Sequence, residues 1–213
     1  MSSDVLVTTP AQRQTEPHAE AVSRNRRQQA TFRKVLAAAM ATLREKSYAD
    51  LTVRLVAARA KVAPATAYTY FSSKNHLIAE VYLDLVRQVP CVTDVNVPMP
   101  TRVTSSLRHL ALVVADEPEI GAACTAALLD GGADPAVRAV RDRIGAEIHR
   151  RITSAIGPGA EPGTVFALEM AFFGALVQAG SGTFTYHEIA DRLGYVVGLI
   201  LAGANEPSTG GSE

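Results

Sequence analysis

Apolar residues recur at helical spacing along most of this 213-residue chain, and no stretch shows the alternation that predicts a strand. The longest regular stripes predict helices over about 23–46 and 74–89, and two short helices over 51–60 and 64–71 lie between them. In the second half, further stripes are separated by breaks such as Gly131-Gly132 and Gly157-Pro158-Gly159. The pattern predicts an all-α fold of about nine helices.

Changes in composition divide the chain into parts. Residues 1–22 mix Ser, Thr, Pro, Gln and Glu without periodicity, which predicts a disordered N-terminal arm. Residues 23–73 are predicted to form a three-helix N-terminal domain. Residues 74–204 form a larger helical domain, in which the helix at 74–89 connects the two, and 205–213 form a flexible tail.

The stretch from Leu51 to Lys74 has the pattern of a helix-turn-helix. Thr52 stands where an N-cap begins the first short helix, and Pro64 stands in the first turn of the second, where a missing N–H is tolerated. The second helix spans about two turns and carries small or hydrogen-bonding side chains, which suits a surface that lies in the major groove of DNA. A solvated helical hairpin is the alternative interpretation.

The distribution of charge along the chain agrees with a DNA-binding N-terminal half. The chain has no formal net charge, but residues 1–90 hold 13 Lys and Arg against 7 Asp and Glu, while residues 91–213 hold 8 against 14. Within 24–74 the ratio is 11 to 2, as expected of a surface that faces phosphates. Arg24, Arg26 and Arg27 could extend this surface into a minor groove or belong to a solvated tail.

The helix-turn-helix stretch resembles the N-terminal signature of the tetracycline-repressor (TetR) family of bacterial regulators. It departs from the family pattern at Lys61, where the turn usually has glycine, and at Ala67, where a larger aliphatic residue is usual. Ala63 replaces a serine that usually caps the second helix, a loss that would cost about 0.5–2 kcal/mol. The matching residues are Leu51, Thr52, Val53, Arg54, Val56, Ala57, Ala60, Val62, Thr66, Tyr68, Tyr70, Phe71, Ser73 and Lys74.

This resemblance implies a regulator that binds double-stranded DNA at a palindromic operator, most simply as a repressor. One short helix reads only three or four base pairs, so two copies about 34 Å apart are needed. By chemistry, Arg54 can pair with guanine and Thr66 can touch a thymine methyl, while hydroxyls and Lys74 suit phosphates. Ala67 and Phe71 are expected to be buried beneath this surface. The resemblance assigns DNA contact to Thr52, Arg54, Pro64, Ala65, Thr66, Tyr68, Tyr70 and Lys74.

The last two predicted helices, at about 163–182 and 186–203, are poor in charge and rich in small residues. Each glycine in a helix interior costs about 0.8–1 kcal/mol, so close helix packing should compensate. We expect these helices to form a four-helix homodimer interface, as the resemblance also implies. The alternative is packing within one chain. The small and polar residues concerned are Ala171, Gly174, Ala175, Gln178, Ala190, Gly194, Gly198 and Ala202.

The second half resembles the effector-binding domain of the same family, which implies a cavity between the helices of 101–183. The candidate lining is apolar, so a small hydrophobic effector that releases the DNA is expected; the alternative is that these residues are plain core. Arg108, His109, Glu169 and Gln178 could orient a ligand. The candidate lining residues are Leu107, Leu110, Cys124, Leu128, Phe166, Met170, Phe173 and Val177.

Other classes of function find little support in the sequence. His109, Cys124 and His149, or Glu117 with Glu119, could be imagined as catalytic, but none stands in a catalytic signature, so we expect no enzyme. Two cysteines without metal-ligand spacing predict no metal site, no cofactor and a reducing compartment. No signal peptide or membrane span is expected, which places the protein in the cytoplasm. A helical adaptor that does not read DNA remains the alternative.

Overall fold

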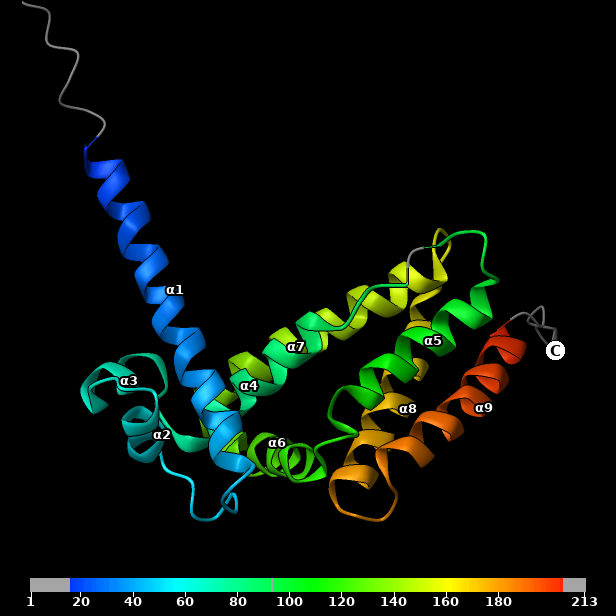
Figure 1. The fold of residues 1–213 in the computed structure, drawn as a ribbon. Helices are drawn as coiled ribbons and strands as arrows, with labels where there is room; N and C mark the ends of the chain where they lie inside the picture. The colour runs from blue at the N-terminus through cyan, green and yellow to red at the C-terminus, as the bar shows by residue number, and fades with distance from the viewer. Residues whose placement is uncertain (1–15, 93, 205–213) are drawn as a thin grey trace, which may run out of the picture.

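The computed structural model describes residues 16–92 and 94–204 (Figure 1). This part of the chain contains nine α-helices and two short 3-10 helices and no strand, so the all-α prediction is confirmed. The helices are α1 (Glu16–Leu43), α2 (Val53–Arg59), α3 (Pro64–Tyr70), α4 (Lys74–Gln88), α5 (Met99–Ala111), η1 (Leu112–Val114), α6 (Pro118–Asp130), η2 (Gly131–Ala133), α7 (Pro135–Ile156), α8 (Pro162–Gly180) and α9 (Tyr186–Ala204).

Helices α1 to α3 form a small N-terminal domain. The predicted apolar stripe of α1 includes Val35, Leu36 and Ala39. These residues are buried in a core that α1 shares with α2 and α3. The predicted helix start at Ser23 is wrong, because α1 begins at Glu16 and its first turns project away from the other helices (Figure 1). The helix therefore includes 16–22, which the sequence assigned to a disordered arm. The remainder of that arm, 1–15, and the tail at 205–213 lie outside the described residues.

The turn between α2 and α3 carries two of the three departures that the sequence singled out. Lys61 adopts a left-handed backbone with φ of 54°, the conformation for which glycine is favoured. Ala63 occupies the N-cap of α3 and makes no side-chain capping hydrogen bond. By contrast, Thr52 caps α2 by accepting a hydrogen bond from the backbone N–H of Leu55 at 3.1 Å. Helix α3 is thus held in place by the turn before it and by its buried face. Its own N-cap residue supplies no capping hydrogen bond.

Replacing Lys61 with glycine is expected to raise the free energy of unfolding by about 1 kcal/mol, because a Cβ atom disfavours the left-handed conformation by roughly that amount. Lys61→Ala is the matched control, since it removes the same charge and keeps the Cβ. Urea unfolding of the two variants and the parent protein measures the difference. Equal stability of the glycine and alanine variants would contradict the backbone explanation.

Helices α4 to α9 form the second domain. Helix α4 packs against α6 and α7, α5 against α7 and α9, and α8 against α6 and α9. The apolar face of α4, including Leu77, Ile78 and Val86, is fully buried, and the core is continuous from the first domain to the second. The long α4 is therefore the element through which the two domains share a core.

Candidate DNA-binding surface and effector cavity

The buried side of the helix-turn-helix is built from α2, α3 and the residue after α3. Val53 and Val56 anchor α2, and Ala67 is the buried position of α3. Phe71, which follows α3, is fully buried and stacks on Phe32 of α1 with ring centroids 5.0 Å apart. The expectation that Ala67 and Phe71 are buried is confirmed. A small residue at 67 brings the α3 backbone close to the core and leaves the rest of α3 on the surface.

The outer side of α2 and α3 presents most of the predicted DNA-contacting residues to solvent. Arg54, Ala65 and Thr66 are exposed, and the Tyr68 side chain is 51% exposed. Tyr70 is half-buried, since its ring packs edge-on against Phe32 at 6.1 Å. Thr52 and Pro64 are exposed at the starts of α2 and α3.

Two arginines of α2 differ in whether their guanidinium groups have partners within the chain. The guanidinium of Arg59 makes two hydrogen bonds to the Glu45 carboxylate, at 2.6 and 2.5 Å. Arg54 makes no ion pair or side-chain hydrogen bond within the described part of the chain. Arg54 is therefore available to a partner, whereas Arg59 is held by its neighbour.

Lys74 also makes contacts within the chain. Its ammonium donates hydrogen bonds to the backbone carbonyls of Tyr48 at 3.1 Å and Ala49 at 3.5 Å, and it lies 4.4 Å above the Tyr48 ring. These contacts tie the start of α4 to the loop after α1. The contact of Lys74 with a DNA phosphate stays a prediction.

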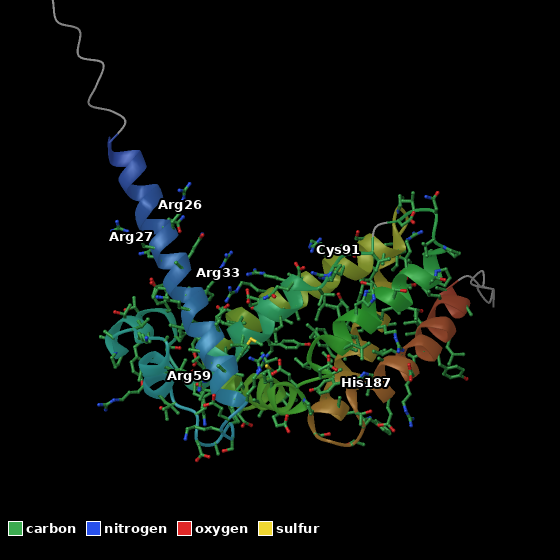
Figure 2. The ribbon with its side chains drawn as sticks, in the orientation of Figure 1. Arg26, Arg27, Arg33, Arg59, Cys91 and His187 are labelled. Carbon is green, nitrogen blue, oxygen red and sulfur yellow. The ribbon has the colours of Figure 1, made fainter. Side chains whose placement is uncertain are left out.

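Basic side chains also follow α1. Arg26, Arg27 and Arg33 are exposed along the part of the helix that projects from the body, whereas the labelled Cys91 and His187 lie over the second domain (Figure 2). The positive charge predicted from the sequence thus lies on one end of the molecule.

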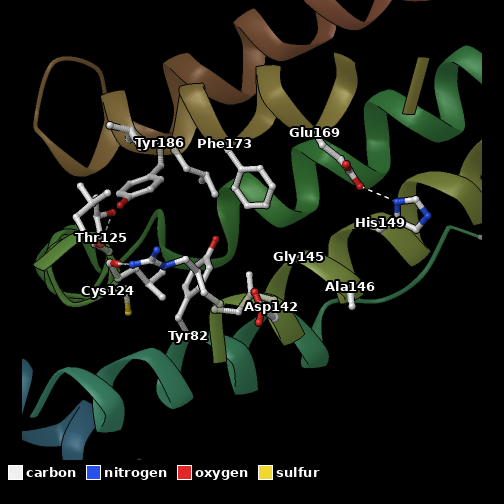
Figure 3. Close-up of a pocket in the computed structure, with 17 residues that line it drawn as sticks. Tyr82, Cys124, Thr125, Asp142, Gly145, Ala146, His149, Glu169, Phe173 and Tyr186 are labelled. Atoms are coloured by element: carbon white, nitrogen blue, oxygen red, sulfur yellow. Dashed lines mark hydrogen bonds and ion pairs between the residues drawn. The ribbon is translucent and has the colours of Figure 1, made fainter. Parts of the chain in front are cut away.

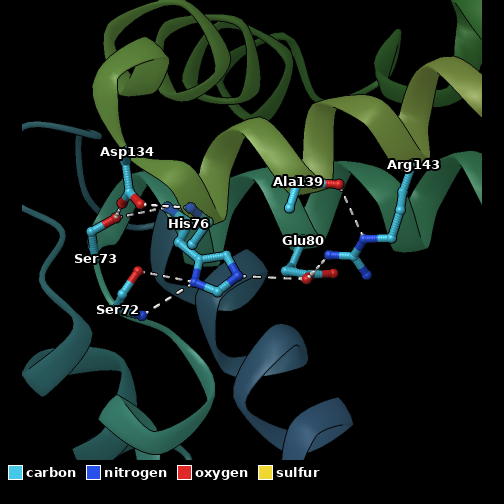
Figure 4. A network of polar contacts seen from close by, with 8 residues as sticks. Ser72, Ser73, His76, Glu80, Asp134, Ala139 and Arg143 are labelled. Atoms are coloured by element: carbon cyan, nitrogen blue, oxygen red, sulfur yellow. Dashed lines mark hydrogen bonds and ion pairs between the residues drawn. The ribbon is translucent and has the colours of Figure 1, made fainter.

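A chain of polar contacts joins α4 to α7 (Figure 4). The Ser73 hydroxyl, which caps α4, donates to Asp134 at 2.8 Å, and Asp134 caps α7 by accepting from the Ala136 N–H at 2.9 Å. The Nε2 atom of His76 lies 3.6 Å from Oε1 of Glu80. The same carboxylate oxygen also pairs with Arg143 of α7. Burial would raise the pKa of Glu80, but hydrogen bonds from His76 and Arg143 outweigh it and keep that pKa below its usual value.

The opposite ends of α4 and α7 are also joined. Arg151 of α7 is 3% exposed, and its guanidinium donates to the carbonyl oxygen of Val89 at 2.7 Å, just past the end of α4. The Nε atom of Arg151 lies 2.9 Å from Oε1 of Glu147, so a carboxylate balances the buried positive charge. No local sequence pattern indicated that caps and buried charges join α4 to α7 along the length of both helices.

A cavity of about 710 Å³ lies among α4, α6, α7, α8 and the start of α9 (Figure 3). Its walls include the apolar Ile144, Leu176 and Leu129. Four predicted lining residues, Cys124, Leu128, Phe173 and Val177, lie on it, and so does the predicted polar residue Glu169. The other residues on its wall are Tyr82, Gly121, Thr125, Arg141, Asp142, Gly145, Ala146, His149 and Tyr186.

The other four predicted lining residues lie elsewhere. Leu107 and Leu110 are fully buried in the core on α5, and Phe166 and Met170 are 62% and 55% exposed on the outer side of α8. Of the remaining polar candidates, Arg108 pairs with Asp191 of α9, and His109 and Gln178 are exposed. None of these seven residues lines the cavity, because α5 and α8 turn those positions toward the core or toward solvent.

The outer sides of α8 and α9 carry an apolar stripe. Tyr195 and Leu199 of α9 are 72% and 57% exposed, and a Cβ added at Gly174 or Gly198 would meet no atom within 4 Å. Packing inside one chain therefore does not account for these two glycines. Helix α8 is also long and apolar enough to cross a membrane by length and composition, with 22% of its apolar window buried.

Comparisons with known proteins agree on one family. The model of bacterial regulatory proteins of the tetR family matches residues 35–81, which cover the end of α1, all of α2 and α3 and about the first half of α4. A protein of Mycobacterium tuberculosis (strain ATCC 25618 / H37Rv) named an HTH-type transcriptional regulator is 99% identical over 213 residues, all of both chains. This chain belongs to the TetR family of transcriptional regulators.

Solved structures share the fold. A TetR transcriptional regulator from Rhodococcus sp. RHA1 superposes with a TM-score of 0.70 at 21% identity, over 84% of this chain and 98% of that one. The Thermus thermophilus FadR, a TetR-family repressor in complex with lauroyl-CoA, gives 0.60 at 18% identity, over 85% and 99%. At such identities the likeness concerns the fold alone, in agreement with the predicted two-domain all-α architecture.

Proposed function

We propose that this regulator is a repressor that binds a palindromic operator as a homodimer and is released by a small hydrophobic effector. The observation that carries the proposal is the position of α4. This helix begins at Lys74, four residues after the recognition helix ends at Tyr70, and its Tyr82 side chain lies on the cavity wall. One helix thus follows the proposed DNA-reading helix after a link of three residues, packs against α1 of the same domain and lines the proposed effector site.

The proposed DNA contacts come from the exposed side of α2 and α3. Arg54, unpaired within the described chain, is assigned to a guanine, and Thr66 is assigned to a thymine methyl. The hydroxyls of Thr52, Tyr68 and Tyr70 are assigned to phosphates. Pro64 and Ala65 let the start of α3 approach the groove closely, since neither projects a long side chain.

The proposed dimer forms through α8 and α9. The exposed apolar side chains of both helices would leave water, and Gly174 and Gly198 would allow close approach of the partner helices. A second copy supplies the second recognition helix that a palindromic site requires. This assignment also gives the apolar α8 a protein surface to cover it in the cytoplasm, where a regulator meets its DNA.

The proposed switch uses the attachment of α4 to α7. Both helices contribute to the cavity wall, and Ser73–Asp134, Glu80–Arg143 and Arg151–Val89 join them from end to end. A ligand that shifts α7 therefore shifts α4 and the recognition helix before it. The ligand can change DNA affinity only by its differential affinity for the two arrangements. The lauroyl-CoA bound to the Thermus thermophilus FadR has a long apolar acyl chain, which supports an apolar ligand group in this cavity.

Replacing Arg54 with alanine is expected to weaken operator binding by about 10- to 100-fold and to relax the base preference at one position of each half-site, because a bidentate guanine contact discriminates by about 1–3 kcal/mol. The matched control is Arg59→Ala on the same helix, whose side chain is held by Glu45. Titration of fluorescent inverted-repeat DNA from beside the coding region, and of single-base variants of it, measures both effects.

Two results would count against the proposal. An unchanged base preference in Arg54→Ala would remove the assigned role of that residue. Equal affinity of the parent protein for the inverted repeat and for scrambled DNA would favour a helical protein that does not read sequence.

A further inference from the structure

The Tyr82 hydroxyl is a buried polar group that lacks a partner. Less than 1 Å² of its oxygen is accessible, and no hydrogen-bond partner lies within reach in the described structure. Thr153 of α7 shares this state but does not line the cavity. Most buried polar atoms in proteins are paired, so an unpaired one on a cavity wall calls for a partner that enters the cavity.

Other hydrogen-bonding groups of the inner wall already have partners. The Cys124 thiol donates to the Ile78 carbonyl at 3.9 Å, and burial raises the pKa of this thiol to about 12, so it stays protonated. The Thr125 hydroxyl donates to the Gly121 carbonyl at 3.1 Å. The Tyr186 hydroxyl lies beside Thr125 (Figure 3). The Tyr82 hydroxyl is the buried inner-wall group without a partner in the described structure.

The direction of the Tyr82 side chain and its chemistry fit this role. In Figure 3 the ring rises from α4 with its hydroxyl directed toward the space below Phe173 and Tyr186. Burial raises the pKa of this hydroxyl well above its usual value, so it remains an O–H donor under all physiological conditions. Neighbouring side chains cover the oxygen, and an acceptor reaches it when an entering ligand displaces them.

The charges around the cavity do not favour one sign of ligand. Arg141 donates to the Leu128 carbonyl, and His149 pairs with Glu169 at 2.8 Å, while Asp142 adds a negative charge. Two basic and two acidic side chains thus share the rim. With walls that are otherwise mostly apolar, the cavity suits an uncharged molecule.

We propose that the effector of this regulator is an uncharged, apolar molecule bearing a hydrogen-bond acceptor such as a ketone, and that Tyr82 selects it by donating to that acceptor. The inference rests on the proposed function, in which this cavity is the effector site. It goes further by naming the residue that determines specificity and the functional group that it recognises.

The test uses two probes of nearly the same shape, 2-acetylnaphthalene and 2-ethylnaphthalene, which differ in a carbonyl oxygen. In the parent protein, the dissociation constant of the ketone should be about fivefold lower than the value predicted from that of the hydrocarbon after correction for the two probes' solubilities in water. One net hydrogen bond accounts for a difference of this size. Tyr82→Phe should lose that preference and keep its affinity for 2-ethylnaphthalene. Competition with a fluorescent apolar dye gives both dissociation constants.

Two further variants make the result specific. Tyr186→Phe removes the other tyrosine hydroxyl of the same cavity, which is not among the buried unpaired groups, so the ketone preference should remain. Gly145→Leu should abolish binding of both probes, since Gly145 lines the cavity and an added Cβ meets no atom within 4 Å. The thermal unfolding of Tyr82→Phe should occur at or above the parent temperature, because the variant loses an unpaired buried hydroxyl.

The outcomes separate this inference from the proposed function. If both probes bind, are lost in Gly145→Leu, and show the same ratio in the parent and in Tyr82→Phe, the cavity binds ligands but Tyr82 does not select them. If neither probe binds the parent protein, or if Gly145→Leu leaves binding intact, both the effector site and the role of Tyr82 are refuted.

Discussion

Replacing Arg151 with alanine is expected to lower the free energy of unfolding by about 3–5 kcal/mol, the range measured when one partner of a buried ion pair is removed. The guanidinium is 3% exposed and makes hydrogen bonds to Glu147 at 2.9 Å and to the Val89 carbonyl at 2.7 Å. Its loss leaves the end of α4 without this donor and opens a gap between α4 and α7. Urea unfolding monitored by circular dichroism, at one fixed protein concentration, measures the change.

The neighbouring Arg150 supplies the matched control. It pairs with the same Glu147 at 2.7 Å, but its side chain is 56% exposed. Exposed ion pairs contribute at most about 1 kcal/mol, so Arg150→Ala should have a small effect. Similar losses in the two variants would show that Arg151 does not hold α4 to α7.

This pair of arginines illustrates what the sequence could not reveal. Arg150 and Arg151 are adjacent and chemically identical, and only the packing of α7 against α4 separates a surface charge from a buried one. Local signals were more reliable. Thr52 was predicted as an N-cap and acts as one, because a cap bonds to the backbone two or three residues away.

The cavity was predicted only in part for a related reason. Helical spacing identifies an apolar face, but it does not distinguish a face that lines a cavity from one that enters the core or meets a second chain. Leu107 lies in the core, Phe166 lies on the surface and Phe173 lies on the cavity, although all three are apolar residues of amphipathic or apolar helices. The unpaired hydroxyl of Tyr82 became apparent only from the tertiary contacts.

The start of α1 shows a local signal that was overlooked. The composition of 1–22 suggested disorder, yet α1 begins at Glu16 and Pro17 follows it. Proline is favoured in the first turn of a helix, where its missing N–H costs nothing. The Glu16-Pro17 pair therefore marks a helix start that the mixed composition around it obscured.

Replacing Leu199 with glutamate is expected to abolish the proposed dimer and to weaken operator binding by about 100-fold or more, since linked binding of two half-sites gains about that factor over binding of one. Leu199 is 57% exposed on α9, beside Gly198, so the single chain tolerates the carboxylate. In a symmetric interface each chain would bury one new charge, and burial of an unpaired charge is strongly unfavourable. Sedimentation velocity measures the mass, and titration of the inverted-repeat DNA measures the affinity.

The control for this prediction is Val95→Glu, which makes the same kind of change at an apolar side chain that is 82% exposed and lies outside α8 and α9. It should leave both the mass and the DNA affinity unchanged. A Leu199→Glu protein that remains dimeric would place the interface on another surface. A monomeric variant that still binds the full operator with parent affinity would mean that one recognition helix suffices. The proposed dimer interface at the small residues of α8 and α9 would then not be needed for DNA binding.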